Sequence, residues 1–113
     1  MLKTPIETAR LAITSFEMGM AQSVWLQSLE GDNKEFMPDE VFETLDEARE
    51  AIARLIAFYR CKGAPLVYPV VLKDGRQIGH VEAVPIASGW EVGYRIAKAH
   101  ANNGYATEAL QAF

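Results

Sequence analysis

The chain has 113 residues, of which 50% are hydrophobic and 23% are charged, so it can bury a core but leaves no room for a second domain. We therefore expect one folded domain over residues 1–113 and exclude an intrinsically disordered chain. The formal net charge of −4 argues against nucleic-acid binding, which normally requires a basic surface.

The cysteine content and the N-terminal residues predict where the protein acts. Cys61 is the only cysteine, so it cannot form an intrachain disulfide and lacks the second sulfur of a zinc or redox motif. The first residues lack the apolar core of a signal peptide, and no apolar run approaches the length of about eighteen residues that a membrane span needs. These features predict a cytoplasmic protein with no membrane partner and no metal.

The first half of the chain predicts a strand, a helix and a connector. Small or apolar residues alternate with polar ones over residues 9–15, which indicates a half-buried strand. Apolar residues recur at helical spacing over residues 17–29, and the Gly-Asp-Asn sequence at 31–33 is a typical helix stop. The connector that follows, up to Glu43, is rich enough in apolar residues that we expect it to pack against the domain.

A second helix is predicted to begin at Thr44. Thr44 is a suitable N-cap, and Glu47 lies at the spacing of a capping box. Apolar residues then recur at intervals of three and four up to Tyr59, and Gly63 ends the pattern. A buried helical face follows from this spacing.

Three consecutive antiparallel strands are predicted next. Residues 66–72 and 76–85 flank the Asp-Gly pair at 74–75, which is favoured in tight hairpin turns. A second turn around residues 87–89 leads into a strand over residues 90–97. A loop of small residues then precedes a helix that begins near Gly104. The order is β-α-α-β-β-β-α, in the α/β (α+β) class.

The loop before the last helix has the features of an anion site. The unpaired N–H groups of a helix's first turn carry partial positive charge, and they converge with the N–H groups of the preceding loop. Gly104 and Ala106 have little or no side chain, so a pyrophosphate can approach the main chain closely. The sequence therefore predicts phosphate binding at this loop.

This order and three segments, Ile6-Glu-Thr-Ala-Arg-Leu-Ala-Ile13, Gly93-Tyr-Arg-Ile-Ala97 and Asn103-Gly-Tyr-Ala-Thr-Glu-Ala-Leu110, resemble the GNAT superfamily of acetyl-CoA-dependent N-acetyltransferases, and the ribosomal-protein N-acetyltransferase branch in particular. The resemblance implies a GNAT-like mixed sheet and covers essentially the whole chain. It covers only the first two thirds of a complete family member, so the fold is expected to lack the rest of the last helix, a fifth strand, a fourth helix and a closing hairpin.

The family's acyl-CoA signature is Arg or Gln, two residues, Gly, one residue, and Gly or Ala. It aligns with Ala101-Asn-Asn-Gly104-Tyr-Ala106, which matches in its second half and departs at Ala101 and Asn102. The resemblance implies that the main chain of Ile96, Ala97 and Lys98 pairs with the pantetheine arm of acetyl-CoA. It further implies that the pyrophosphate is held by residues Ala101, Asn102, Asn103, Gly104, Tyr105, Ala106 and Thr107.

The resemblance also implies direct attack of a primary amine on the thioester, without a covalent enzyme intermediate. A base must take the ammonium proton. Glu91 is the first candidate, because related enzymes often place a carboxylate on this strand facing the acceptor, and Glu82 is the second. The general acid is expected beyond residue 113. His80 and His100 have no evident partner in the sequence, so we expect structural or exposed roles for both.

Two interpretations stay open from the sequence. In the first, the protein is an N-acetyltransferase, and its primary amine belongs to a protein N-terminus, a small polyamine-like metabolite or an aminoglycoside. In the second, the chain is a noncatalytic truncated module that binds CoA or dimerises. In either case the strand over residues 90–97 would present an unpaired edge, and exposed edges recruit partners. We therefore expect a homodimer.

Overall fold

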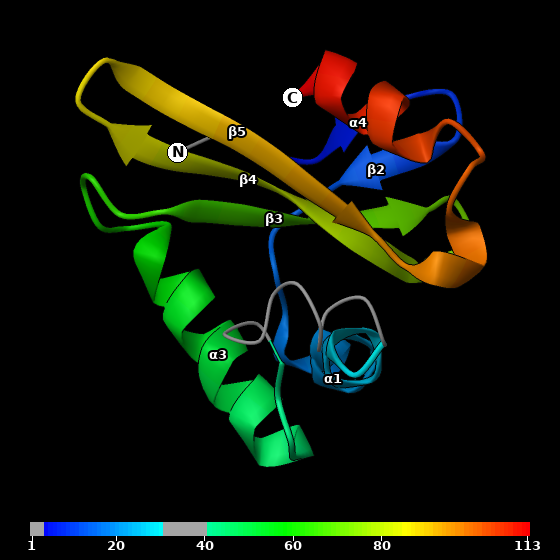
Figure 1. Cartoon of the computed structure of the whole chain (residues 1–113), viewed down its shortest axis with the longest axis horizontal. Coiled ribbons are helices and arrows are strands. Elements are labelled where there is room, and N and C mark those ends of the chain that lie inside the picture. Colours follow the sequence, from blue (N-terminus) through cyan, green and yellow to red (C-terminus); the bar gives the residue numbers. More distant parts are fainter. Residues whose placement is uncertain (1–3, 31–40) are drawn as a thin grey trace.

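The computed structural model describes residues 4–30 and 41–113, and in it a five-stranded antiparallel sheet carries helices on both faces (Figure 1). The strands follow one another across the sheet in the order β1-β2-β3-β4-β5. Helices α1 and α3 cover one face, and α4 covers the other. The elements are β1 (Ile6–Glu7), β2 (Leu11–Ile13), the 3-10 turn η1 (Met18–Met20), α1 (Ala21–Ser28), α3 (Leu45–Phe58), β3 (Leu66–Leu72), β4 (Gln77–Ile86), β5 (Gly89–Ile96), the 3-10 turn η3 (Lys98–His100) and α4 (Tyr105–Ala112). The predicted class is confirmed, and so is the element order, with β1 as an additional short strand at the start.

The core has one cluster on each face of the sheet. On the α4 face, Ala109 packs with Leu11, Tyr68 and other fully buried strand residues. On the opposite face, Ile52 of α3 packs with Phe16 and neighbouring apolar groups. Complete burial of a side chain such as Ile52 contributes about 1.5–3 kcal/mol, so these clusters attach the helices to the sheet.

The predicted first strand is wrong in its bounds. A reversal of the chain at residues 8–10 separates β1 from β2, so Ala9 and Arg10 lie in a turn. The N–H of Thr8 donates to the carbonyl of Leu11 at 2.9 Å, and the hydroxyl oxygen of Thr8 accepts from the N–H of Leu11 at 3.0 Å. The side chain of Thr8 therefore closes this turn. The alternation of small and polar residues, from which the strand was predicted, contains no sign of the turn.

The predicted cap of the second helix is confirmed. The hydroxyl oxygen of Thr44 accepts a hydrogen bond from the N–H of Glu47 at 3.1 Å. The carboxylate of Glu47 accepts a hydrogen bond from the N–H of Glu43 at 2.8 Å. In the usual capping box the donor is the N–H of the cap residue itself, one position later. The helix buries Ala48, Ala51 and Ile52, which lie on its predicted apolar face.

Two glycines shape the strands on either side of β4: one closes a turn, and the other allows a close approach between strands. Gly75, with φ of 94°, closes the predicted turn between β3 and β4, and its N–H donates to the carbonyl of Leu72 at 2.9 Å. Gly79 lies where β4 approaches β5, and a Cβ at this position would stand 2.0 Å from the carbonyl oxygen of Arg95. A side chain there would force the two strands apart.

Tyr59, at the end of α3, connects this helix to β3 and to the segment that follows β2. Its hydroxyl accepts a hydrogen bond from the N–H of Phe16 at 3.1 Å and donates one to the carbonyl of Val67. Its ring stacks on Tyr68 with 5.0 Å between centroids. Burial raises the pKa of Tyr59 to about 12, so the hydroxyl keeps its proton and its two hydrogen bonds at neutral pH.

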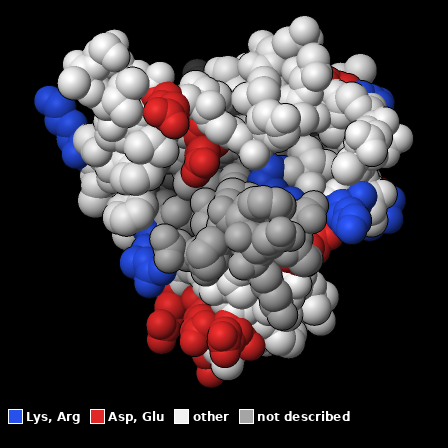
Figure 2. Space-filling model, in the orientation of Figure 1, with Lys and Arg blue, Asp and Glu red and all other residues white. Residues whose placement is uncertain are grey.

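The connector expected to pack against the domain falls largely on residues 31–40, which lie outside the described residues. The side chain of Cys61 is exposed. In the described ranges no helix has the length and apolar content to cross a membrane. Acidic side chains gather at the lower end of the molecule, where α3 begins with Asp46 and Glu47, whereas basic groups are dispersed over the face shown in Figure 2.

Candidate functional site

The loop between β5 and α4 adopts the conformation that an anion site needs. Asn102 and Gly104 have positive φ values of 65° and 77°, and Gly104 is the residue before the first turn of α4. Within the described residues, the main-chain N–H groups of residues 102–107 donate to no acceptor. Unpaired N–H groups in such a loop and at a helix start attract a phosphate.

A cavity of about 410 Å³ opens against this loop, and we call it the loop cavity. It is lined by Tyr94, Arg95, Ile96, His100, Ala101, Asn102, Gly104, Tyr105, Ala106 and Thr107. Most residues predicted to bind acetyl-CoA therefore surround one space. His100, which was expected to be structural or exposed, is also part of this lining.

Three of the predicted cofactor residues have other roles. The N–H of Ala97 donates to the carbonyl of Ile78 at 2.7 Å, and the N–H of Lys98 donates to the carboxylate of Glu30 at 3.0 Å. The side-chain amide of Asn103 donates to the carbonyls of His100 and Ala101 at 3.1 and 3.2 Å, which stabilises the loop. None of the three lines the loop cavity.

The edge of β5 that faces away from β4, which no other described strand pairs with, leads to the loop cavity. Ala97 bonds to Ile78 across the Gly79–Ile96 pair, so that pair is of the kind that shares no direct hydrogen bonds. In an antiparallel ladder the main-chain groups of Ile96 and Tyr94 then point away from β4. The carbonyl of Ile96 accepts a hydrogen bond from the guanidinium of Arg95 at 3.2 Å. Among the described residues, no partner is found for the N–H of Ile96 or for the outward groups of Tyr94, which suits a ligand that lies along the edge as an added strand.

Arg10, in the turn between β1 and β2, contacts both the β5–α4 loop and the first turns of α4. Its guanidinium donates to Glu108 Oε1 at 2.7 Å and to the carbonyl of Asn103 at 2.9 Å, and it stacks over the ring of Tyr105 at 4.4 Å. The hydroxyl of Thr8 and the N–H of Arg10 also donate to the carboxylate of Glu108. These bonds, with the Thr8 hydroxyl the largest contributor, lower the pKa of Glu108 to about 2, so it is ionised at neutral pH.

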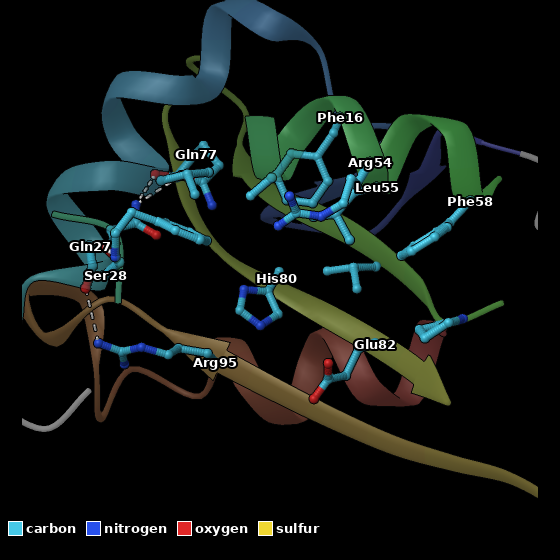
Figure 3. Close-up of a pocket in the computed structure, with 15 residues that line it drawn as sticks. Phe16, Gln27, Ser28, Arg54, Leu55, Phe58, Gln77, His80, Glu82 and Arg95 are labelled. Carbon is cyan, nitrogen blue, oxygen red and sulfur yellow. Dashed lines mark hydrogen bonds between the residues drawn. The ribbon is translucent and has the colours of Figure 1, made fainter. Parts of the chain in front are cut away.

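A second cavity, of about 330 Å³, lies between α1, α3 and the sheet, and we call it the sheet pocket (Figure 3). Its walls are largely apolar, with polar groups on the sheet and on α3. The lining comprises Phe16, Val24, Gln27, Ser28, Phe42, Ala51, Arg54, Leu55, Phe58, Pro65, Val67, Gln77, His80, Glu82 and Arg95. A mostly apolar concavity with a few convergent polar groups is typical of a small-molecule site.

The polar floor of the sheet pocket comes from two neighbouring strands. His80 lies opposite Arg95, and Glu82 lies opposite Gly93, so the side chains share one face of β4 and β5. Burial, reinforced by the Arg95 guanidinium, lowers the pKa of His80 to about 4. The imidazole is therefore neutral at pH 7, beside a carboxylate and a guanidinium.

Arg95 belongs to both linings. Its side chain is only 13% exposed and donates to Glu30 Oε1 at 2.8 Å and to the carbonyl of Gln27 at 3.4 Å, both from the end of the α1 region. Glu30 also holds the N–H of Lys98. This ion pair fixes the end of β5 against the α1 side of the molecule, between the two cavities.

The two candidate bases are placed differently. Glu82 lines the sheet pocket, whereas Glu91 pairs with Val84 near the hairpin end of β5, is exposed, and lines neither cavity. His80 is a pocket residue that sequence reasoning did not select. The spacing of His80 and Glu82, two residues apart on one strand, was the signal that would have placed both on the same face. Over residues 4–30 and 41–113, no group of three His, Cys, Asp or Glu side chains is placed to hold a metal.

Comparison with known families identifies the domain type. A family model described as "Acetyltransferase (GNAT) domain" matches residues 10–113. Sequence comparison with curated proteins gave no match.

Solved structures share the fold. An acetyltransferase of the GNAT family from Bacillus anthracis superposes with a TM-score of 0.79 at 25% identity, over 96% of this chain and 63% of its own. RimL, a ribosomal L7/L12 alpha-N-protein acetyltransferase in complex with coenzyme A, gives 0.77 at 18% identity, over 96% and 64%. The microcin C7 self-immunity acetyltransferase MccE, in complex with acetyl-CoA and AMP, gives 0.75 at 13% identity, over 93% and 61%. The chain thus spans less than two thirds of the length of these relatives.

Proposed function

The chain belongs to the GNAT acetyltransferase family, and on this premise we propose that it binds acetyl-CoA in the loop cavity and presents it to a primary amine held in the sheet pocket. One observation carries the proposal: in the part of the chain that the structure describes, the N–H groups of residues 102–107, at the start of α4, have no acceptor. The CoA and acetyl-CoA complexes of RimL and MccE support the choice of ligand.

The residues of the loop cavity fit a nucleotide pyrophosphate. Gly104 leaves the main chain uncovered, and the positive φ of Asn102 helps successive N–H groups to converge. The outward N–H of Ile96 and the outward main-chain groups of Tyr94 suit the amide-bearing pantetheine arm, which would lie along β5. The N–H groups of Ala97 and Lys98 have partners already, so we assign the pairing to the N–H of Ile96 and to Tyr94.

Glu82 is the proposed general base. Acetyl-CoA supplies an activated acetyl thioester, so the chain has to deliver a neutral amine to it. The carboxylate of Glu82 stands on the floor of the sheet pocket and is placed to hold an ammonium group and accept its proton. We keep Glu91 as the second candidate because it shares the sheet face with Glu82 but lies outside the pocket lining.

Calorimetry with CoA tests the loop. The Gly104→Val variant should abolish CoA binding, because a β-branched residue both disfavours the positive φ and covers the main chain. Gly63→Val is the matched control: Gly63 has φ of 82°, against 77° for Gly104, but lies outside both cavities. Unchanged CoA affinity in Gly104→Val, or no binding by the parent chain, would refute the proposal.

A noncatalytic, dimerising module is the second candidate. Trp90, Val92 and Tyr94 are 53%, 51% and 55% exposed on β5, which has β4 as its sole neighbour among the described strands. An apolar strand edge favours association with a second copy. Light scattering should then report a dimer whose affinity falls in Trp90→Lys, and a monomer at high concentration would count against it. A cytoplasmic location stays a prediction.

A further inference from the structure

We infer that the acceptor is a primary amine joined to a compact apolar body that also carries an anionic group, and that polycationic amines are excluded. This inference rests on the proposed function, because it takes the sheet pocket as the acceptor site. It separates the polyamine and aminoglycoside alternatives from the amino-acid-like and peptide ones.

The acidic groups of the sheet pocket decide how many ammonium groups can be paired there. Among its described lining residues Glu82 is the sole acid, and the neighbouring imidazole of His80 is uncharged at neutral pH. Within this described lining, the carboxylate of Glu82 can pair a single ammonium group. Each further ammonium of a polyamine would lose its hydration against apolar walls without gaining a counter-charge, which is costly.

The cations of the pocket point to an anion on the ligand. Arg95 is already paired with Glu30, so its charge is compensated within the protein. Arg54, which extends over the pocket from α3, has no carboxylate partner among the described residues (Figure 3). A guanidinium in this position attracts a carboxylate or phosphate and repels a second ammonium.

The walls limit the body of the ligand. Phe16, Leu55 and Phe58 face the space between Arg54 and Glu82, and the volume of about 330 Å³ is at the small end for ligand sites. An aromatic or branched aliphatic group of single-residue size fits these walls. The amine and the anion then lie at opposite sides of one small apolar group.

Two matched pairs of acceptors test the anion. Phenylalanine is compared with phenylalanine amide, and the dipeptide amide Phe-Asp with Phe-Asn, so each pair differs mainly in one negative charge. Binding to the 113-residue protein is followed by NMR through the main-chain N–H signals of Leu55 and His80, with and without CoA. We expect the anionic member of at least one pair to bind about tenfold more tightly than its neutral partner, and spermidine to bind weakest. The first pair reports a free amino acid and the second a peptide N-terminus.

Arg54→Gln should remove the preference for the anionic member while leaving CoA affinity unchanged. Arg60→Gln, an exposed position beyond the end of α3 and outside the pocket lining, should keep the preference. Equal binding within both pairs, tighter binding of spermidine, or no binding of any acceptor overturns the inference even if CoA binds. Failure of CoA binding instead refutes the proposed function, because the acceptor titrations without CoA are read separately.

Discussion

Glu82 Oε1 lies 3.0 Å from the position that a Cβ on Gly93 would occupy, so the carboxylate of β4 fills the space above the glycine of β5. The absence of a side chain at residue 93 lets Glu82 lie close to the strand along which we place the thioester. Glycine here is a means of positioning the proposed base, because no positive φ accounts for it.

Gly93→Ala should therefore slow acetyl transfer without unfolding the protein. The added methyl group displaces the far end of a flexible side chain by a few tenths of an ångström, and misplacement of a catalytic group is costly to the rate. We expect kcat of the complete enzyme to fall about tenfold and Tm to change by about 1–2 °C. Gly19→Ala, where an added Cβ meets nothing within 4 Å, is the control. A full rate in Gly93→Ala would contradict this role for Gly93.

Stability should fall as the pH is lowered from about 6.5 to 4. The folded pKa of His80, about 4, lies below its unfolded value of 6.5, so the unfolded chain binds the extra proton in this window. His80 then contributes stability that is complete above pH 6.5 and is lost as the pH falls through 4. Urea titrations should show a decrease of roughly 1–3 kcal/mol that His80→Gln flattens. An NMR titration that places the pKa of His80 near 6.5 would contradict the prediction.

Glu108→Gln should loosen the loop that we assign to CoA. The neutral amide keeps the shape of the side chain but loses the charge that holds Arg10 and the Thr8 hydroxyl. The folded pKa of about 2 lies below the ordinary 4.5, so this stabilisation is complete above pH 4.5 and disappears as the pH falls through 2. Calorimetry should show weaker CoA binding at pH 7, and the difference in Tm should shrink towards pH 2. Glu50→Gln, at an exposed position on α3, should change neither quantity.

Tyr59→Phe should destabilise the fold. The variant keeps the ring on Tyr68 but leaves the N–H of Phe16 without its acceptor. Loss of a partly buried hydrogen-bonding group of this kind costs about 1–3 kcal/mol. Urea unfolding measures the change, and Tyr94→Phe, whose exposed hydroxyl has no partner among the described residues, is the control. Equal stability of the two variants would show that the Tyr59 hydroxyl contributes little.

The elements that local chemistry dictates were predictable from the sequence. The Thr44 cap, the Asp74-Gly75 turn and the strand-to-helix bend at Gly104 each depend on residues within a few positions of one another. The turn at Thr8 depends on a side-chain hydrogen bond, which the alternation of apolar and polar residues does not indicate. The predicted strand therefore began too early.

The site was predictable only in part, because its contacts join distant residues. The loop around Gly104 is one continuous segment, and most of its members do line one cavity. The sheet pocket instead combines α1, α3 and two strands, so neither the inward position of His80 nor the contact of Arg54 with this space follows from spacing alone. The hydrogen bond from the N–H of Lys98 to Glu30 joins residues that are 68 positions apart in the sequence. The sequence therefore did not show that this N–H group, expected to meet the pantetheine arm, has a partner within the protein.

The shared position of Arg95 limits how such a protein can diversify. A replacement of Arg95 would reshape the loop cavity and the sheet pocket together, so under our proposal a change of amine preference made there would also disturb CoA binding. The side chains of α1 and α3 that line a cavity line the sheet pocket and not the loop cavity. If the proposed sites are right, substitutions on these helices can change the amine preference while β5, along which we place acetyl-CoA, stays as it is.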